Sequence, residues 1–555
     1  MGDDRSQSPL FILVRPRREA FDYGILPFLA SNVNPTLFLS NLKNDFRSSL
    51  KIDASVLSDK LKVSKDRACF IIETIASILP DGVKLDDRGV VDVDHLILFL
   101  YLQNYKRMAP CRINKDSPAV SDVWPSISAF DKCISLDSPR QFLRSNSRHF
   151  IPSQADEDIH QLSYLQKNIA NMLTLLLEPG EEKNRDSLVS ILDRFEHLGI
   201  LIQFFKDGHE EIPLRQAISF FLNSDENKPN LSDHVTRISE WVLHNIDVSL
   251  ECSCHKVTEK ENGQLNASDG SSNQTRNFVV SSPLPDVVEC MSKISVVKKE
   301  HDLKGSSVKV MNCYDSVIYL LAPLKYATIS GCSDSTVVLG AVGKTVRVEG
   351  CERLQIIMAA KRVCVINCRE CIYYMGVNER PVFLGDNHKL QVAPYNTFYS
   401  QLNEHINQVS LNVNINRWNE PLVLGMTDLH DVSHSAGIDD VEAETPTCID
   451  PQLFAKFVIP DWYRKESKDT PQSIEANPFV LPEKYTNNLM KIDMALDNVQ
   501  QTFRDTQLAE ENKRELIYSL HLHFKEWLYA SGNVRQLYCL QDDCRLEQGL
   551  AQVRI

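Results

Sequence analysis

A repeat with a step of about 19 residues between Val308 and Leu390 constrains the fold more than any other feature of this 555-residue chain. Each copy reads apolar-x-apolar-x-[Asn/Gly]-Cys, and an apolar run then ends seven residues after the cysteine. The four clear copies are VKVMNCYDSVIYL from Val308, ATISGCSDSTVVL from Ala327, VRVEGCERLQIIM from Val346 and VCVINCRECIYYM from Val363, and a weaker fifth is VFLGDNHKLQV from Val382.

Each copy predicts two short strands joined by a tight corner. The first strand alternates apolar and polar residues, and the second is rich in β-branched and long apolar residues. Asn or Gly at the corner tolerates the left-handed φ that a tight turn needs. So short a coil cannot hold a helix as well as two strands. Stacking such coils buries a column of like positions, so the repeat predicts a right-handed parallel β-helix.

The cysteines of the repeat are predicted to stack as an inward ladder of small apolar side chains. The ladder comprises Cys313, Cys332, Cys351 and Cys368, with Asn387 in the fifth position, at steps of 19, 19, 17 and 19 residues. Cys371, three residues after Cys368, is expected to have another orientation. The CREC spelling is therefore interpreted as a coincidence with the repeat, not as a redox or metal motif.

The composition excludes several functional classes. The net charge is −14 and the pI is about 5.6, which argues against nucleic acid as the main partner. The apolar runs are too short to span a bilayer, and 15 cysteines without a secretory signal favour reduced thiols in the cytoplasm. Gly2 and Ser6 fit the N-myristoylation pattern, but Asp3 and Asp4 oppose an anionic membrane, so we expect no acylation.

The sequence predicts a multidomain α + β chain. Apolar residues at helical spacing, as in DRACFIIETIASILP, indicate a mostly α-helical domain over residues 1–250. Asn, Ser and Gly then dominate a stretch interpreted as a flexible linker, 251–280. The β-helix domain is placed at 281–434, an irregular acidic, proline-containing connector at 435–484, and C-terminal helices at 485–555.

Metal, cofactor and catalytic motifs are not expected. Cys252, Cys254 and His255 lie together in ECSCHK, but no second pair of ligands follows at the spacing of a zinc site. His521 and His523 fall on different sides of a predicted helix. The sequence shows no phosphate-cradling loop and no catalytic triad, so we expect no enzyme.

The repeat, together with VAPYNTFYSQL from Val392 and NRWNEPLVL from Asn416, resembles the C-CAP/cofactor C-like domain. Tubulin-binding cofactor C, the retinitis pigmentosa protein and cyclase-associated proteins share that domain. The segment FILVRPRREAFDYGILPF and the two helical ends resemble the TBCC domain-containing protein 1 subfamily. The resemblance implies a cytoplasmic, cytoskeleton-associated role: microtubule organisation, positioning of the centrosome or spindle pole and of the Golgi, and cell shape.

The resemblance also implies a position at which a GTPase-activating residue would lie. Cofactor C and the retinitis pigmentosa protein are GTPase activators whose Gln-x-Arg motif supplies an arginine finger. That motif falls on Arg362-Val363-Cys364, so arginine replaces the glutamine and cysteine replaces the finger. A thiol cannot offer a fixed cation to phosphate oxygens, so activation of the family type is not expected.

A basic patch is predicted where the finger is lost. Val363 points inward, so Arg362 and Cys364 point outward, and Arg347 in the previous coil lies beside Cys364, about 4.8 Å away. We hypothesise that this region contacts tubulin, a small GTPase or a centrosomal or cytoskeletal protein through Arg347, Arg362, Cys364, Lys344 and Lys361. A merely solvated charged face, a GTPase activator with Arg347 or Arg362 as a displaced finger, and an actin-binding module are the alternatives.

Overall fold

The structure is a computed structural model, and the chain divides into two compact units that are described separately. Unit 1 comprises Met1–Ser282 with Thr427–Gly437, and unit 2 comprises Pro283–Met426 with Ile438–Ile555. The structure describes residues 12–26, 34–46, 51–79, 89–107, 111–112, 149–150, 154–177, 188–206, 210–223, 231–262, 286–289, 291–303, 306–424, 444–459, 477–505 and 510–530.

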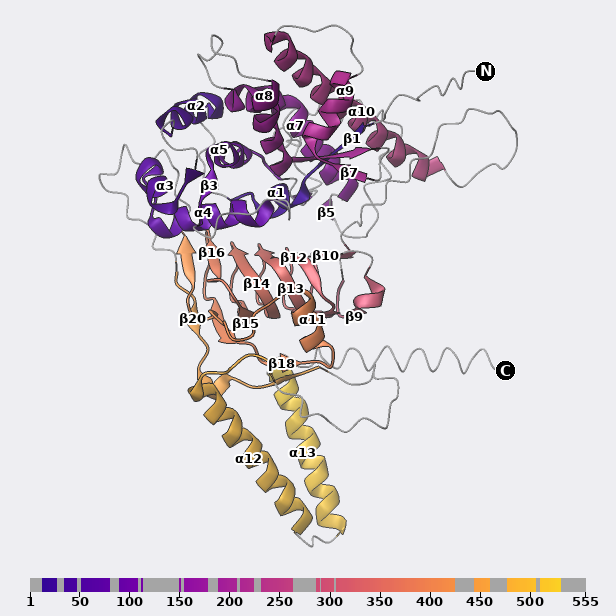
Figure 1. Ribbon diagram of the computed structural model, residues 1–555. Helices are drawn as coiled ribbons and strands as arrows, with labels where there is room; N and C mark the ends of the chain where they lie inside the picture. Colours follow the sequence, from indigo (N-terminus) through magenta and orange to yellow (C-terminus); the bar gives the residue numbers. More distant parts are fainter. Residues whose placement is uncertain are drawn as a thin grey trace, which may run out of the picture. The chain divides into compact units, whose positions relative to one another are not determined.

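Unit 2 is built on a solenoid of two parallel sheets, called here sheet A and sheet B (Figure 1). Neighbouring strands within each sheet pair in parallel and come from successive coils. Sheet A contains β8 (Asp286–Glu289), β10 (Ser307–Met311), β12 (Leu324–Ser330), the second halves of β13 (Thr336–Glu349) and β14 (Gln355–Ile366), β16 (Val382–Leu384) and β19 (Leu422–Leu424). Sheet B contains β9 (Ser295–Lys299), β11 (Val317–Leu321), the first halves of β13 and β14, β15 (Ile372–Val377), β17 (Gln391–Pro394) and β20 (Thr447–Cys448).

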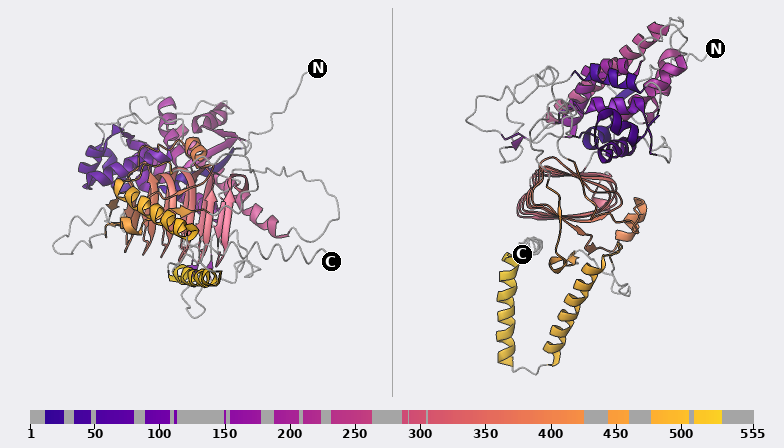
Figure 2. Two further views of the ribbon diagram at one scale, coloured as in Figure 1. Left: turned by 90° about the horizontal axis from the view of Figure 1, so that it is seen from below. Right: turned by 90° about the vertical axis from the view of Figure 1, so that its left-hand side faces the viewer.

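The predicted parallel β-helix is thus confirmed. Viewed along its axis, the solenoid shows its coils lying over one another (Figure 2). The alternation of each first strand turns its valines inward: Val346 pairs with Val363 and Val348 with Val365, and all four are fully buried. Burying such columns of β-branched side chains supplies the hydrophobic stabilisation that a single short coil lacks.

The solenoid starts one coil earlier than the repeat predicts. Strands β8 and β9 form this coil, and the bridge between Ser292 and Tyr314 fixes its register. That register puts Met291 at the position of Cys313. The cysteine pattern therefore breaks in this coil although the alternation of the strands continues, and the sequence pattern missed it.

The corners adopt the left-handed backbone that Asn and Gly were expected to permit. The φ values of Asn312, Gly331, Gly350 and Asn367 lie between 51° and 61°. A second left-handed residue, which the sequence analysis did not anticipate, follows three positions later in each of these coils. These residues are Asp315, Asp334, Arg353 and Glu370, with φ between 48° and 54°.

Segments after the repeat complete unit 2. Helix α11 (Leu402–Gln408) packs against β13. Residues 444–459, expected to be irregular, instead include β20, the 3₁₀ helix η4 (Pro451–Leu453) and β21 (Phe457–Val458), which pairs with β18 (Thr397–Phe398). The backbone groups of this connector find hydrogen-bond partners at the edge of the solenoid, which explains its order. Helices α12 (Glu483–Asp505) and α13 (Glu510–Ala530) follow, as predicted.

Unit 1 is mainly helical, as predicted, but it also contains a small sheet. Strand β1 (Ile12–Pro16) pairs antiparallel with β6 (Ile202–Lys206), which pairs with β7 (Glu210–Ile212); two-residue strands form the pairs β2 (Lys51–Ile52) with β3 (Val91–Asp92) and β4 (Cys111–Arg112) with β5 (His149–Phe150). The helices are α1 (Arg18–Tyr23), α2 (Pro35–Asp45), α3 (Ala54–Leu61), α4 (Lys65–Ile78), α5 (Val93–Leu102), α7 (Gln154–Leu176), α8 (Leu188–Glu196), the 3₁₀ helix η1 (His197–Ile200), α9 (Leu214–Asn223) and α10 (Leu231–Asn262).

The predicted boundary between the helical domain and the linker lies inside a helix. Helix α10 continues to Asn262, so the first part of the linker predicted at 251–280 is helical, and residues 263–280 lie outside the described residues. Gly2 and Ser6 of the acylation pattern also lie outside them. Among the described helices, none combines the length and apolar character needed to cross a bilayer.

Candidate functional site

The repeat cysteines lie inside the solenoid and make a regular set of hydrogen bonds. Each thiol of the four coils donates to the carbonyl two residues before it, at 3.3 to 3.5 Å. The backbone N–H of Cys313 in turn donates to Sγ of Cys332 at 3.4 Å. At a corner, the N–H groups leave the sheet ladder, so a side chain of the next coil supplies the acceptor that a buried N–H needs.

Asn387 continues this arrangement with different chemistry. Its Oδ1 accepts the backbone N–H of Cys368 at 2.8 Å, and its Nδ2 donates to the carbonyl of Leu384 at 2.9 Å. An amide thus replaces a thiol as both acceptor and donor, which explains why Asn occupies the fifth position of the ladder.

Cys371 belongs to a second ladder, three residues after the first. Ser316 N–H donates to Oγ of Ser335 at 3.0 Å, and Leu354 N–H donates to Sγ of Cys371 at 3.4 Å. Contact with the Cys368 thiol, followed by burial, raises the pKa of Cys371. Both cysteines of CREC are fully buried inside the solenoid, and each thiol donates to a backbone carbonyl, which supports a structural role for this segment.

The strand that resembles the finger segment is β14 in sheet A. Arg347 of β13 pairs in register with Cys364, and Val382 of β16 pairs with Cys364 on the other side. The predicted juxtaposition of Arg347 and Cys364 is therefore present. The Cys364 side chain is buried, with 4% of the residue exposed.

The predicted exposure of the two arginines is wrong. Only 3% of Arg347 and 5% of Arg362 is exposed. Arg347 Nε donates to Glu349 Oε2 at 3.0 Å, and Arg362 Nε donates to Glu379 Oε2 at 2.7 Å. A buried guanidinium requires such carboxylate partners. The alternation of residues along a strand predicts which way a side chain points, but it does not predict which carboxylate pairs with it.

The two lysines of the predicted patch differ from the arginines. Lys361 is exposed, while Lys344 is half-buried, with its Nζ 5.7 Å from the centre of the Tyr326 ring. A cation over an aromatic face is favoured electrostatically. Of the predicted basic patch, Lys361 is therefore the cation that remains at the surface.

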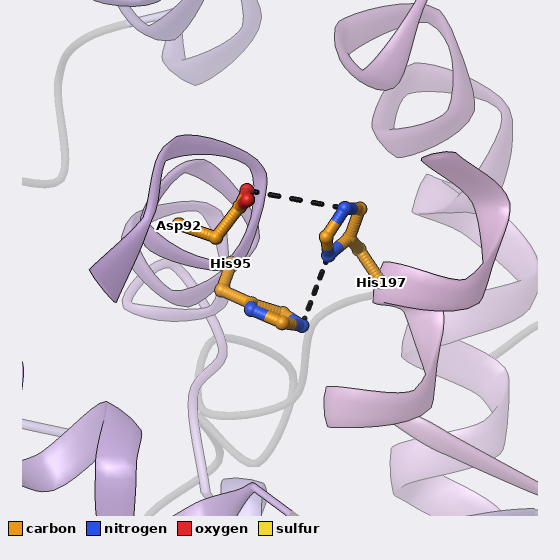
Figure 3. A group of neighbouring side chains, drawn as sticks. All are labelled: Asp92, His95 and His197. Atoms are coloured by element: carbon orange, nitrogen blue, oxygen red, sulfur yellow. Dashed lines mark hydrogen bonds and ion pairs between the residues drawn. The ribbon is translucent and has the colours of Figure 1, made fainter. Parts of the chain in front are cut away.

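Unit 1 brings together a group of metal-binding side chains that the sequence analysis missed. Asp92, His95 and His197 each offer one possible ligand atom, and these atoms lie within 4.8 Å of one another. The His197 ring lies between the other two side chains and faces His95 through Nδ1 and Asp92 through Nε2 (Figure 3). His197 is about a hundred residues from the other two, so no spacing pattern could have revealed the group. The ECSCHK segment expected to bind no metal lies in α10, where the side chains after Cys252 fall outside the described residues.

Comparisons with known proteins agree with the solenoid and extend beyond it. The family model of tubulin binding cofactor C matches residues 305–422. TBCC domain-containing protein 1 of Xenopus laevis is 23% identical over 497 residues, covering 83% of this chain and 82% of that protein. The protein of that name from Danio rerio is 23% identical over 571 residues, covering 94% and 92%. The one from Homo sapiens is 26% identical over 251 residues, covering 45% and 42%.

The family match falls within the region where the sequence analysis placed the resemblance, and the longer alignments cover most of the chain. The chain is thus similar to TBCC domain-containing protein 1 along most of its length, and residues 305–422 match the tubulin binding cofactor C family.

Proposed function

We propose that this protein is a non-catalytic cytoskeletal organiser whose solenoid binds another protein. Its roles would be in microtubule organisation, in positioning the centrosome or spindle pole and the Golgi, and in cell shape. Tubulin, a small GTPase or a centrosomal protein is the proposed class of partner. The tubulin binding cofactor C domain supports the link to the cytoskeleton.

One observation carries the non-catalytic part of the proposal. Cys364 occupies the position at which the resemblance places the arginine finger. Its register partner Arg347 and the preceding Arg362 of the same strand each pair with a carboxylate of the same solenoid. An arginine finger must be able to reach phosphate oxygens, and its removal costs about 10³ to 10⁵ in rate. A buried arginine would first have to leave its carboxylate behind as an unpaired charge.

Single-turnover GTP hydrolysis tests this proposal against activation by a displaced finger. Tubulin and Arf-like GTPases are each loaded with GTP and mixed with the full-length chain. We expect rates within a few-fold of the GTPase alone. A gain of about a hundredfold or more that Arg347→Ala or Arg362→Ala abolishes would contradict the proposal and establish the displaced finger.

Binding to tubulin tests the surface around the finger position. Lys361→Glu reverses the exposed charge of this region, and Arg369→Glu, at an exposed corner of the same solenoid, is the matched control. We expect Lys361→Glu to weaken tubulin binding several-fold, since a charge reversal adds repulsion from an acidic partner. Equal affinities of the wild type and both variants would remove this face from the proposal.

A further inference from the structure

The Asp92, His95 and His197 group is assembled by two neighbouring elements of unit 1. Asp92 is the N-cap of α5, and its Oδ1 accepts the N–H of Asp94 at 2.8 Å. His95 follows in the first turn of α5, and His197 opens η1, which packs against α5. A helix that is buried along almost its whole length holds the first two residues, so the group sits on a rigid element.

One donor atom from each of the three residues lies close enough to the others for a small divalent ion to bridge them. His197 Nδ1 and His95 Nε2 lie 3.0 Å apart, and the three ligand atoms all lie within 4.8 Å of one another (Figure 3). The other ring nitrogen of His197, Nε2, lies 3.9 Å from Asp92 Oδ1. Ligands at about 2.0 to 2.2 Å from a tetrahedral zinc ion are themselves about 3.4 Å apart. Small shifts of the side chains would bring three donors to that spacing.

The carboxylate still has capacity for a ligand. A separation of 3.9 Å between Asp92 and the His197 ring is longer than a hydrogen bond. An ionised carboxylate offers about four lone-pair sites, and capping Asp94 uses one of them. Asp92 can therefore cap α5 and bind an ion at the same time.

The two imidazoles face each other through one nitrogen each. His197 Nδ1 and His95 Nε2 lie 3.0 Å apart, so one of these nitrogens carries the hydrogen of a single hydrogen bond and the other offers a lone pair. When that hydrogen moves to the other nitrogen of its own ring, both facing lone pairs are available to a cation.

We propose that Asp92, His95 and His197 form a binding site for a divalent transition metal ion, with zinc as the ion whose preferences they match best. Two imidazoles and one carboxylate form a ligand set that zinc binds, and three protein ligands leave a fourth position open to water. The site holds α5 and η1 together through the ion.

Cobalt binding tests the site directly, because Co²⁺ reports its ligands by colour. The full-length chain is freed of metal with a chelator and titrated with Co²⁺, followed by competition with Zn²⁺. We expect one Co²⁺ per chain with the visible bands of nitrogen and oxygen ligands. Cysteine ligands would instead give a sulfur charge-transfer band in the near ultraviolet, and a wild-type spectrum showing only that band would overturn the proposal.

Asp92→Asn is the most informative variant. Asn caps a helix as well as Asp does, so α5 keeps its N-cap while the ion loses its carboxylate. We expect Asp92→Asn and His197→Gln each to weaken Co²⁺ binding at least tenfold, since losing even an outer-shell partner of a metal site costs about 10- to 100-fold. If His197→Gln fails to fold, Asp92→Asn alone decides the result.

His388→Gln is the matched control. His388 pairs with Asp386 at 2.6 Å and Glu444 at 3.4 Å on the surface of unit 2, which gives one histidine with two carboxylates. This variant should leave the affinity for Co²⁺ unchanged. Wild-type affinity in Asp92→Asn and His197→Gln, or a loss of binding in His388→Gln, would refute the assignment.

Discussion

The side chain at the cysteine position has two roles. It fills the interior of the solenoid, and it can accept a hydrogen bond from a backbone N–H of the preceding coil. Cys332 accepts the N–H of Cys313, and Asn387 accepts the N–H of Cys368. A buried N–H without an acceptor costs about 1 to 3 kcal/mol, so the second role constrains the residue type as strongly as the first. Cysteine and asparagine share little in polarity, but both offer an acceptor at this point.

Substitutions at Asn387 separate these two roles. Asn387→Ala leaves the N–H of Cys368 without its acceptor, so we expect it to lower the free energy of unfolding of unit 2 by about 1 to 3 kcal/mol. Asn387→Cys restores the side chain used in the preceding coils and should cost less than half as much. Urea unfolding of both variants measures the difference. Equal losses would mean that volume alone matters at this position.

The candidate site shows what residue-level reasoning could and could not predict. The repeat alone gave the register that places Arg347 beside Cys364, because a step of 17 residues joins these two positions. The repeat did not predict that Arg347 is buried. Its partner Glu349 lies two residues along the strand, and nothing in the sequence indicates that the Glu349 side chain turns toward the guanidinium. The same holds for Arg362 and Glu379.

At the scale of the element, the first corner of each coil was predictable because its residues strongly prefer a tight turn. The second corner was not predicted because its residues have no common preference of this kind. Asn and Gly mark the first corner because they tolerate a left-handed φ. The second corner places Asp315, Asp334, Arg353 and Glu370 in the same conformation, and Arg and Glu carry no signal for it. The strain at such residues, about 1 to 2 kcal/mol each, is offset by the stacking of identical corners above and below.

Gly350 tests this account of the first corner. Its φ is 59°, and a Cβ there would meet no atom within 4 Å. Gly350→Asn installs the residue found at the equivalent Asn312 and Asn367, so we expect a loss of less than about 1 kcal/mol in unfolding free energy. Gly350→Val should cost about 1 to 2 kcal/mol more, because a β-branched residue is strained at positive φ.

Gly331 serves as the comparison for that pair of variants. It has the same backbone conformation, with φ of 61°, but a Cβ there would lie 2.5 Å from Oδ1 of Asn312. Gly331→Asn should therefore be more destabilising than Gly350→Asn in the same chemical denaturation experiment. Equal effects at the two glycines would show that backbone conformation, rather than contact with the coil below, sets the cost.

Whole-molecule organisation was predictable in outline, because helical spacing and the 19-residue repeat occupy different parts of the chain. The small sheet of unit 1 was not, since β1 pairs with β6 across nearly two hundred residues and the strands are short. The Asp92, His95 and His197 group has the same origin. Both features arise from contacts between segments far apart in the chain, which a local pattern cannot encode.

The two units each have a core of their own, and this predicts two separable unfolding transitions. Ile97 in α5 and Ile357 in β14 are both fully buried, one in each unit. Truncating a buried isoleucine to alanine costs about 2 to 5 kcal/mol, so Ile97→Ala should lower only the calorimetric transition of unit 1. Ile357→Ala should lower only the transition of the β-rich unit 2. Calorimetry of the full-length variants measures both shifts. Substitutions at distant, independent sites act separately, so each variant should move one transition and leave the other in place. A single transition that both substitutions lower equally would show that the two units unfold as one.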